Sequence, residues 1–123
     1  IQNFALVKEI VHGHRNNGMI YDEALGSVDG VTLLHQPKKG RSSYWVYTLR
    51  VERRDDFVKK LQAEGIACSR VHDRNDKHAC LNKYRIPLPG TDEVCSDMIC
   101  IPCGWWVTAS DANHVVNVIR SGW

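Results

Sequence analysis

Apolar and small side chains recur at intervals of three and four residues along the first 25 residues of the chain. The positions that follow this spacing are Phe4, Val7, Val11, His14, Gly18, Tyr21 and Leu25. The spacing gathers them on one face of a helix, so it predicts one long helix over residues 3–25. Gly13 and the Asn-Asn-Gly run at 16–18 are poor helix formers, each costing up to ~1 kcal/mol relative to Ala. They predict a weak point near 16–18. Gly26 suits the left-handed position that follows a helix.

Alternating or β-branched apolar residues predict four short strands in the rest of the chain. The strands are expected at Val31–His35, Ser43–Glu52, Ile66–His72 and Ile99–Cys103. In the second strand, alternation divides the side chains into a face with Trp45, Tyr47, Leu49 and Val51 and a face with Thr48, Arg50 and Glu52. The strand–helix–strand run from Tyr44 to Val71 fits a right-handed parallel crossover unit.

Three shorter helices are predicted from their first turns. Asp55 and Asp56 open one of them, because acidic residues in a first turn favour the helix dipole. Thr91 is expected to cap a second, short helix. Thr108 is expected to cap the last helix in a capping-box arrangement with Asp111.

Together these elements predict an α/β (α+β) fold. It is a small two-layer sandwich in which a mixed sheet of about four strands packs against four helices. The 123 residues suffice for one domain, 1–123, with a core of its own. A single layer of helices leaves one sheet face partly bare. With the long first helix, this predicts open apolar surface and self-association in solution.

Composition is that of an ordinary soluble globular protein, with 43% hydrophobic residues, 24% charged residues and a net charge of +2. Lys38, Lys39 and Arg41 form the one compact basic cluster, and the other positive residues are scattered. Nucleic-acid binding needs a basic stripe, so nucleic acid is not an expected partner. No apolar run approaches the ~18 residues that span a bilayer, and no membrane partner is expected. The chain begins at Ile1, inside an amphipathic pattern and without a signal peptide. We therefore expect a fragment, a processed product or a trimmed chain.

The five cysteines are odd in number and lack a paired framework, which favours reduced thiols and a cytoplasmic protein. Cys100 and Cys103 form a C-x-x-C motif. A zinc site needs four ligands, and the other cysteines are isolated. A redox motif begins a helix, whereas four residues separate Cys103 from the Thr108 cap. We interpret both cysteines as structural, with no metal ligand assigned; metal or redox chemistry is the less favoured alternative.

A polar run, His-Asp-Arg-Asn-Asp-Lys-His at 72–78, follows the third predicted strand. Ligand sites commonly lie beyond strand ends in α/β layouts, so His72, Arg74 and His78 are candidates for binding an anionic or polar substrate. The alternative is a solvated loop. No glycine-rich phosphate loop or nucleophile motif is present, so no catalytic residue is assigned. The Trp105-Trp106 pair is expected to have one packed ring and one ring at an interface.

Several segments carry a family resemblance in the expected order. They are Tyr21–Leu25, Gly30–Leu34, Ser43–Thr48, Gly65-Ile66, Val71-His72-x-Arg74-x-x-x-His78 and Ile101–Thr108. Together they resemble the C-terminal small domain of the DegT/DnrJ/EryC1/StrS family, which are fold-type I, pyridoxal-phosphate-dependent sugar aminotransferases. The resemblance covers essentially the whole chain. It implies a homodimeric parent enzyme that moves an amino group from glutamate to a nucleotide-linked keto-sugar, for surface polysaccharide or antibiotic biosynthesis.

The resemblance also implies that the large pyridoxal-phosphate-binding domain is not in this chain. None of the seven lysines stands in the family's Ser-x-x-x-Lys-like cofactor context. We therefore expect no cofactor bound to this chain alone and no transamination by it. By position, His72 matches a small-domain histidine on the substrate side of the active site, and Arg74 and His78 are carried over with it. Asp73 stands where the family places an aromatic residue, so the resemblance does not identify which sugar the parent enzyme uses. The alternative is a freestanding α/β ligand-binding or protein-interaction module.

Overall fold

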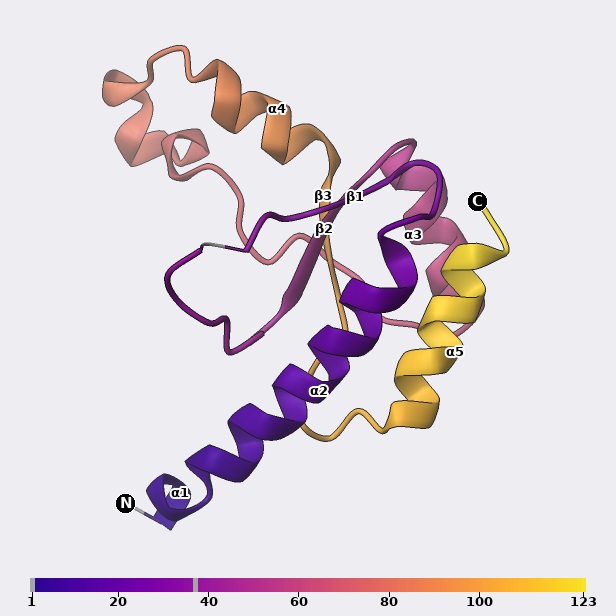
Figure 1. The fold of residues 1–123 in the computed structure, drawn as a ribbon. Coiled ribbons are helices and arrows are strands. Elements are labelled where there is room, and N and C mark those ends of the chain that lie inside the picture. Colours follow the sequence, from indigo (N-terminus) through magenta and orange to yellow (C-terminus); the bar gives the residue numbers. More distant parts are fainter. Residues whose placement is uncertain (1, 37) are drawn as a thin grey trace.

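A three-stranded antiparallel sheet, in the order β1-β2-β3, is the centre of the fold (Figure 1). The computed structural model describes residues 2–36 and 38–123. The strands are β1 (Val31–Leu33), β2 (Tyr47–Val51) and β3 (Met98–Ile101). The helices are α1 (Gln2–Ala5), α2 (Val7–Leu25), α3 (Arg54–Ala63), α4 (Pro89–Asp97) and α5 (Ala109–Arg120), with 3₁₀ turns at Asn75–Lys77 and Ala79–Tyr84.

The core lies between the sheet and a layer formed by α2, α3 and α5. Tyr47, Leu49 and Val51 of β2 are buried on the side of these helices, as their alternation predicts. The side chains that complete the core are Tyr21, Leu25, Phe57, Leu61, Ala112, Val115, Val116 and Ile119. Each large apolar side chain buried there contributes ~1.5–3 kcal/mol. The helices α2 and α5 lie side by side (Figure 1), and Arg120 of α5 donates a 2.9 Å hydrogen bond to the carbonyl of Ala24.

The predicted long helix forms, but its irregular point is not at 16–18. Helix α2 runs unbroken from Val7 to Leu25, and the chain departs from it at Leu6, which separates the short α1. The poor helix formers mark places of close packing instead. A Cβ at Gly18 would lie 2.7 Å from the ring of Tyr44, and one at Gly13 would lie 3.0 Å from Trp105. Asn17 is buried and donates to the carbonyl oxygens of Gly104 and Val107.

Two helix-end predictions are wrong. Gly26 has a right-handed conformation, with φ −64° and ψ −15°, because the chain continues in a turn closed by the hydrogen bond from Val28 N to Leu25 O. Thr91 does not cap α4, which begins two residues earlier at Pro89. Proline is favoured at the first helical position because its missing N–H has no partner there in any helix. The capping box between Thr108 and Asp111 is confirmed in both directions.

The sheet has fewer strands than predicted, and they are not mixed in direction. Ile66–His72 is not a regular strand, because only Ser69 pairs with the sheet, through an antiparallel bridge to Cys100. Since β3 is antiparallel both to β2 and to this bridge, the segment at Ser69 runs in the direction of β2. It does not pair with β2, because β3 lies between them. The two strands of the predicted parallel crossover are therefore not adjacent in the sheet and are not hydrogen-bonded to each other.

The predicted strand Ser43–Glu52 is also shorter than expected. Pairing begins at Tyr47, because Tyr44 has φ +49° and bends the chain away from the β conformation. As a result Trp45 does not share the buried face, and 65% of it is exposed. The second face of β2 is polar: Arg50 is half-buried and binds Asp97 and Glu93 of α4.

The glycines of α2 give a first prediction. Gly18→Ala gains helix propensity of up to ~1 kcal/mol, but its methyl group would overpack against the Tyr44 ring, at a typical cost of ~1–3 kcal/mol. We expect a net loss of stability. Gly26→Ala is the matched control, because its Cβ meets only ordinary contacts from 3.5 Å outward; it should gain ~0.4–1 kcal/mol. Urea unfolding checks both. A Gly18→Ala protein as stable as the parent chain would contradict the packing described.

Candidate functional site

The candidate residues His72, Arg74 and His78 lie in the segment that leaves the sheet after Ser69 and returns through α4. This segment stands apart from the α2–α5 layer, on the other side of the sheet (Figure 1). His72 and His78 are exposed, whereas Arg74 is buried. Within the described residues, no hydrogen bond or ring contact joins the three side chains to one another. The structure thus brings them into one segment but not into one cluster.

Arg74 is engaged by its own segment. Its Nε donates to Asp76 at 2.8 Å, and its terminal nitrogens bind Asp76 and Asp92. A longer bond of 3.4 Å reaches the carbonyl of Ile86. The hydrogen bond from Arg74 lowers the pKa of the Asp76 carboxyl below its usual value. Because its guanidinium is already bound to two carboxylates, Arg74 connects the 3₁₀ turns to α4 and offers little to an anionic substrate.

His72 is placed differently. Its ring centroid lies 6.0 Å from that of Trp45, at an interplanar angle of 47°. Both side chains are exposed, so they form a small aromatic surface from two distant parts of the sequence. An imidazole in this position is free to donate or accept a hydrogen bond, and the indole offers an apolar face to a ring. The alternation of residues 43–52 placed Trp45 on the same face as Tyr47, Leu49 and Val51, and so did not indicate this pair.

Cys100 and Cys103 occupy structural positions. Both are buried and free. Cys103 donates a long 3.4 Å hydrogen bond to the carbonyl of His14, and Cys100 lies 3.3 Å from the hydroxyl of Thr48. Burial raises the pKa of the Cys103 thiol to about 12, which disfavours the reactive thiolate. In residues 2–36 and 38–123, no group of three or more His, Cys, Asp or Glu side chains is arranged to hold a metal ion.

Neither ring of the tryptophan pair is buried. Trp105 is 57% exposed and Trp106 is 68% exposed, so the expectation of one packed ring is wrong. The Trp106 ring folds over Gly104, whereas the backbone and Cβ of Trp105 lie against Gly13.

A polar cluster that the sequence pattern did not indicate joins α2 to the chain before β2. Tyr44 and Tyr47 both donate their phenol protons to the carboxylate of Asp22, at 2.5 and 2.7 Å. The Asp22 and Tyr44–Tyr47 positions lie within motifs of the family resemblance. The signal that could have indicated the cluster is an acidic residue next to the core position Tyr21 in α2.

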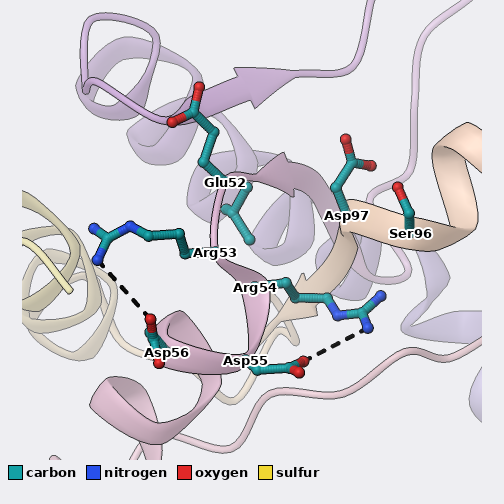
Figure 2. A pocket seen from close by; sticks show the side chains of 8 residues that line it. Glu52, Arg53, Arg54, Asp55, Asp56, Ser96 and Asp97 are labelled. Carbon is teal, nitrogen blue, oxygen red and sulfur yellow. Dashed lines mark ion pairs between the residues drawn. The ribbon is translucent and has the colours of Figure 1, made fainter.

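A cleft of about 440 Å³ lies at the corner between β2 and α3, and Figure 2 shows its lining of acidic and basic side chains. The charges pair with one another, Arg53 with Asp56 at 3.9 Å and Arg54 with Asp55 at 3.6 Å. Arg54 also donates to the carbonyl of Cys95. Both arginines that line this cleft are thus engaged by neighbouring acidic residues or backbone, so neither indicates an anionic substrate.

The lysines do not form a cofactor pocket. All seven lie in the described part of the chain, and six are exposed. The seventh, Lys60, keeps 32% of its side chain exposed and pairs with Glu64 at 3.1 Å. A Schiff-base lysine requires a pocket that orients and tunes the cofactor. The residues of this chain therefore do not fit a complete pyridoxal phosphate site. No helix in the described ranges is long and apolar enough to cross a membrane.

The order of these elements and the sequence define a class of protein. The chain belongs to the DegT/DnrJ/EryC1/StrS aminotransferase family, whose sequence model matches residues 1–120. Members of this family are pyridoxal-phosphate-dependent sugar aminotransferases. No curated protein matches the chain significantly.

Solved structures give the particular relatives. The chain is similar to the sugar aminotransferase CalS13 from Micromonospora echinospora, with 40% identity and a TM-score of 0.95 over 98% of this chain and 33% of that chain. It is similar to AtS13 from Actinomadura melliaura, with 41% identity and a TM-score of 0.95 over 98% of this chain and 32% of that chain. DesV from S. venezuelae, solved with a ketimine intermediate, shares the fold at 19% identity and a TM-score of 0.90, over 96% of this chain and 33% of that chain. The chain thus spans about a third of the length of these relatives.

The ion pairs of Arg74 give a second prediction. Arg74→Ala should speed amide hydrogen exchange across residues 75–97, because it leaves Asp76 and Asp92 without their shared partner. Exchange in β2 should not change. Arg70→Ala is the matched control, since Arg70 makes only an open 3.8 Å pair with Asp73. Exchange in 75–97 that is as slow in Arg74→Ala as in Arg70→Ala would contradict the connecting role.

The stability that the Arg74–Asp76 ion pair gives to the folded chain should depend on pH in one direction. Because the pKa of Asp76 is lowered in the folded chain, this stability is fully present above the ordinary Asp pKa of about 3.9. It is lost as the pH falls further.

Proposed function

We propose that this chain is the C-terminal small domain of a pyridoxal-phosphate-dependent aminotransferase. The parent enzyme moves an amino group from glutamate to a keto-sugar carried by a nucleotide, in surface polysaccharide or amino-sugar biosynthesis. The observation that carries this proposal is the family match over residues 1–120 together with coverage of about a third of CalS13 and AtS13. The large domain of the parent supplies the Schiff-base lysine and the aspartate at the cofactor's pyridine nitrogen, and the parent acts as a homodimer.

In this proposal the small domain contributes substrate contacts. His72 binds the nucleotide-sugar, and its exposed ring beside Trp45 supports this role. His78 is exposed and is the second candidate. Arg74 contributes chiefly by holding the segment that bears both histidines, since its guanidinium is bound to Asp76 and Asp92. We also propose a cytoplasmic location, which the five free cysteines support.

The cofactor prediction applies to this chain alone. Incubation with pyridoxal phosphate followed by borohydride reduction should give only scattered, substoichiometric labelling, because every lysine is exposed or partly exposed. Peptide mass spectrometry locates the labelled lysines. A stoichiometric adduct on one lysine would show that the chain holds a cofactor pocket. The proposal that the large domain supplies the Schiff-base lysine would then be wrong.

The function is tested in the full-length parent. His72→Ala should raise KM for the nucleotide-linked keto-sugar or lower kcat, because it removes a polar contact to the substrate. His114→Ala is the matched control, since His114 is exposed on α5 and should leave both constants unchanged. Amino-group transfer from glutamate is the assay. Equal kinetics for the two variants would remove His72 from the substrate site, and a parent without transamination would contradict the function itself.

We further propose that the chain self-associates when its parent partners are absent. Phe4, Leu6 and Val7 at the N-terminal end, and the tryptophan pair, are largely exposed, and large exposed apolar surfaces favour association. Light scattering at rising protein concentration should give a mass above that of the 14.0 kDa monomer. A monomeric mass at high concentration would count against it.

A further inference from the structure

A second, smaller cleft opens where β1 and β2 separate. Their pairing ends at Leu33 opposite Leu49, and the connecting loop then swings away from the sheet (Figure 1). The opening has a volume of about 210 Å³. Asp22 and the segments 34–36 and 42–48 supply its lining, so three parts of the sequence meet there.

The Asp22 carboxylate and the two phenols present hydrogen-bond acceptors to this cleft. The phenol protons of Tyr44 and Tyr47 are both donated to Asp22. Burial and Asp22 raise the pKa of Tyr44 to about 12, so this phenol stays protonated and keeps its bond. Each phenol oxygen retains acceptor capacity, and the carboxylate oxygens retain further lone pairs. Gln36, Ser42 and Thr48 also line the cleft, and their side chains can both donate and accept. A ligand that carries donors would pair with the phenol oxygens and with the Asp22 carboxylate.

Tyr44 is fixed from every side. Its N–H donates to the hydroxyl of Ser42 at 3.0 Å, and its carbonyl accepts from Nδ1 of His14 at 2.8 Å. Its ring lies against Gly18 and stacks on Tyr47, with centroids 5.7 Å apart. Its φ of +49° is unusual for a residue with a side chain. Such conformations persist where the surroundings over-determine them, and they cluster at ligand sites.

We propose that this cleft binds a single sugar ring that carries hydroxyl and ammonium donors, an amino sugar. The Asp22 carboxylate in its lining attracts an ammonium group and repels phosphate or carboxylate groups. The volume of about 210 Å³ equals that of roughly seven waters at ~30 Å³ each. It is large enough for one six-membered ring. The choice of a sugar among donor-rich molecules rests on the function proposed above.

The test uses the full 123-residue chain, labelled with ¹⁵N and titrated with glucosamine at millimolar concentrations. Amide shifts should concentrate at Gln36, Ser42 and Val46, which line the cleft. Glucuronic acid has a similar ring but carries a carboxylate, and it should bind at least about tenfold more weakly. Ethanolamine carries an amine without a ring and should shift the same amides far less.

Two variants locate the interaction. Asp22→Asn keeps the size of the side chain but removes the negative charge, and should weaken glucosamine binding by about tenfold or more. Gln36→Ala removes a cleft-lining side chain that is exposed, so it leaves the core intact and should also weaken binding. Gln62→Ala on α3, exposed and far from the cleft in the sequence, is the matched control.

The proposal is overturned if glucosamine shifts no cleft amide, if glucuronic acid binds as well, or if both Asp22→Asn and Gln36→Ala bind like Gln62→Ala. Equal amide shifts with ethanolamine would contradict the proposal that the ligand is a sugar ring. These outcomes concern sugar binding by the isolated chain. They therefore do not decide whether the parent enzyme catalyses transamination, which is measured separately. A parent without transamination would in turn leave the measured cleft affinity unchanged.

Discussion

The fold depends on the absence of side chains at two positions of α2. Because Gly13 and Gly18 carry no Cβ, Trp105 and Tyr44 lie directly against the helix backbone. Asn17, between them in sequence, holds the carbonyls of Gly104 and Val107. Helix α2 thus binds both the segment before β2 and the link between β3 and α5. These residues cost helix propensity, and the tertiary contacts that they permit offset that cost.

This packing also determines where the candidate chemistry lies. Tyr44 packs on Gly18, completes the cluster on Asp22 and delays the start of β2 to Tyr47. The next residue, Trp45, therefore turns outward beside His72. On the other face of the sheet, Arg50 and Arg74 hold α4 through carboxylates. One side of the molecule is therefore fixed by apolar contacts with the core helices. The other, which bears the candidate histidines, is attached through ion pairs.

Local patterns predicted the elements better than the pairings. The capping box at Thr108 and the alternation of β2 were predictable because each depends on neighbours in the sequence. The irregular path of Ile66–His72 was not, because its one bridge needs Cys100, thirty-one positions from Ser69. The same holds for the site. The sequence indicated that Arg74 is a charged residue in a polar loop. It did not indicate that carboxylates bind the Arg74 guanidinium in a buried position. The cluster on Asp22 depends on two tyrosines more than twenty residues away.

We propose that this domain supplies substrate contacts to an enzyme whose cofactor lysine lies elsewhere in a longer chain. The coding sequence upstream of the Ile1 codon tests this claim. The relatives are about three times as long as this chain. We expect an open reading frame that continues upstream for about twice the length of this chain and encodes a Schiff-base lysine in the family context. An in-frame stop codon shortly before Ile1 would contradict the claim.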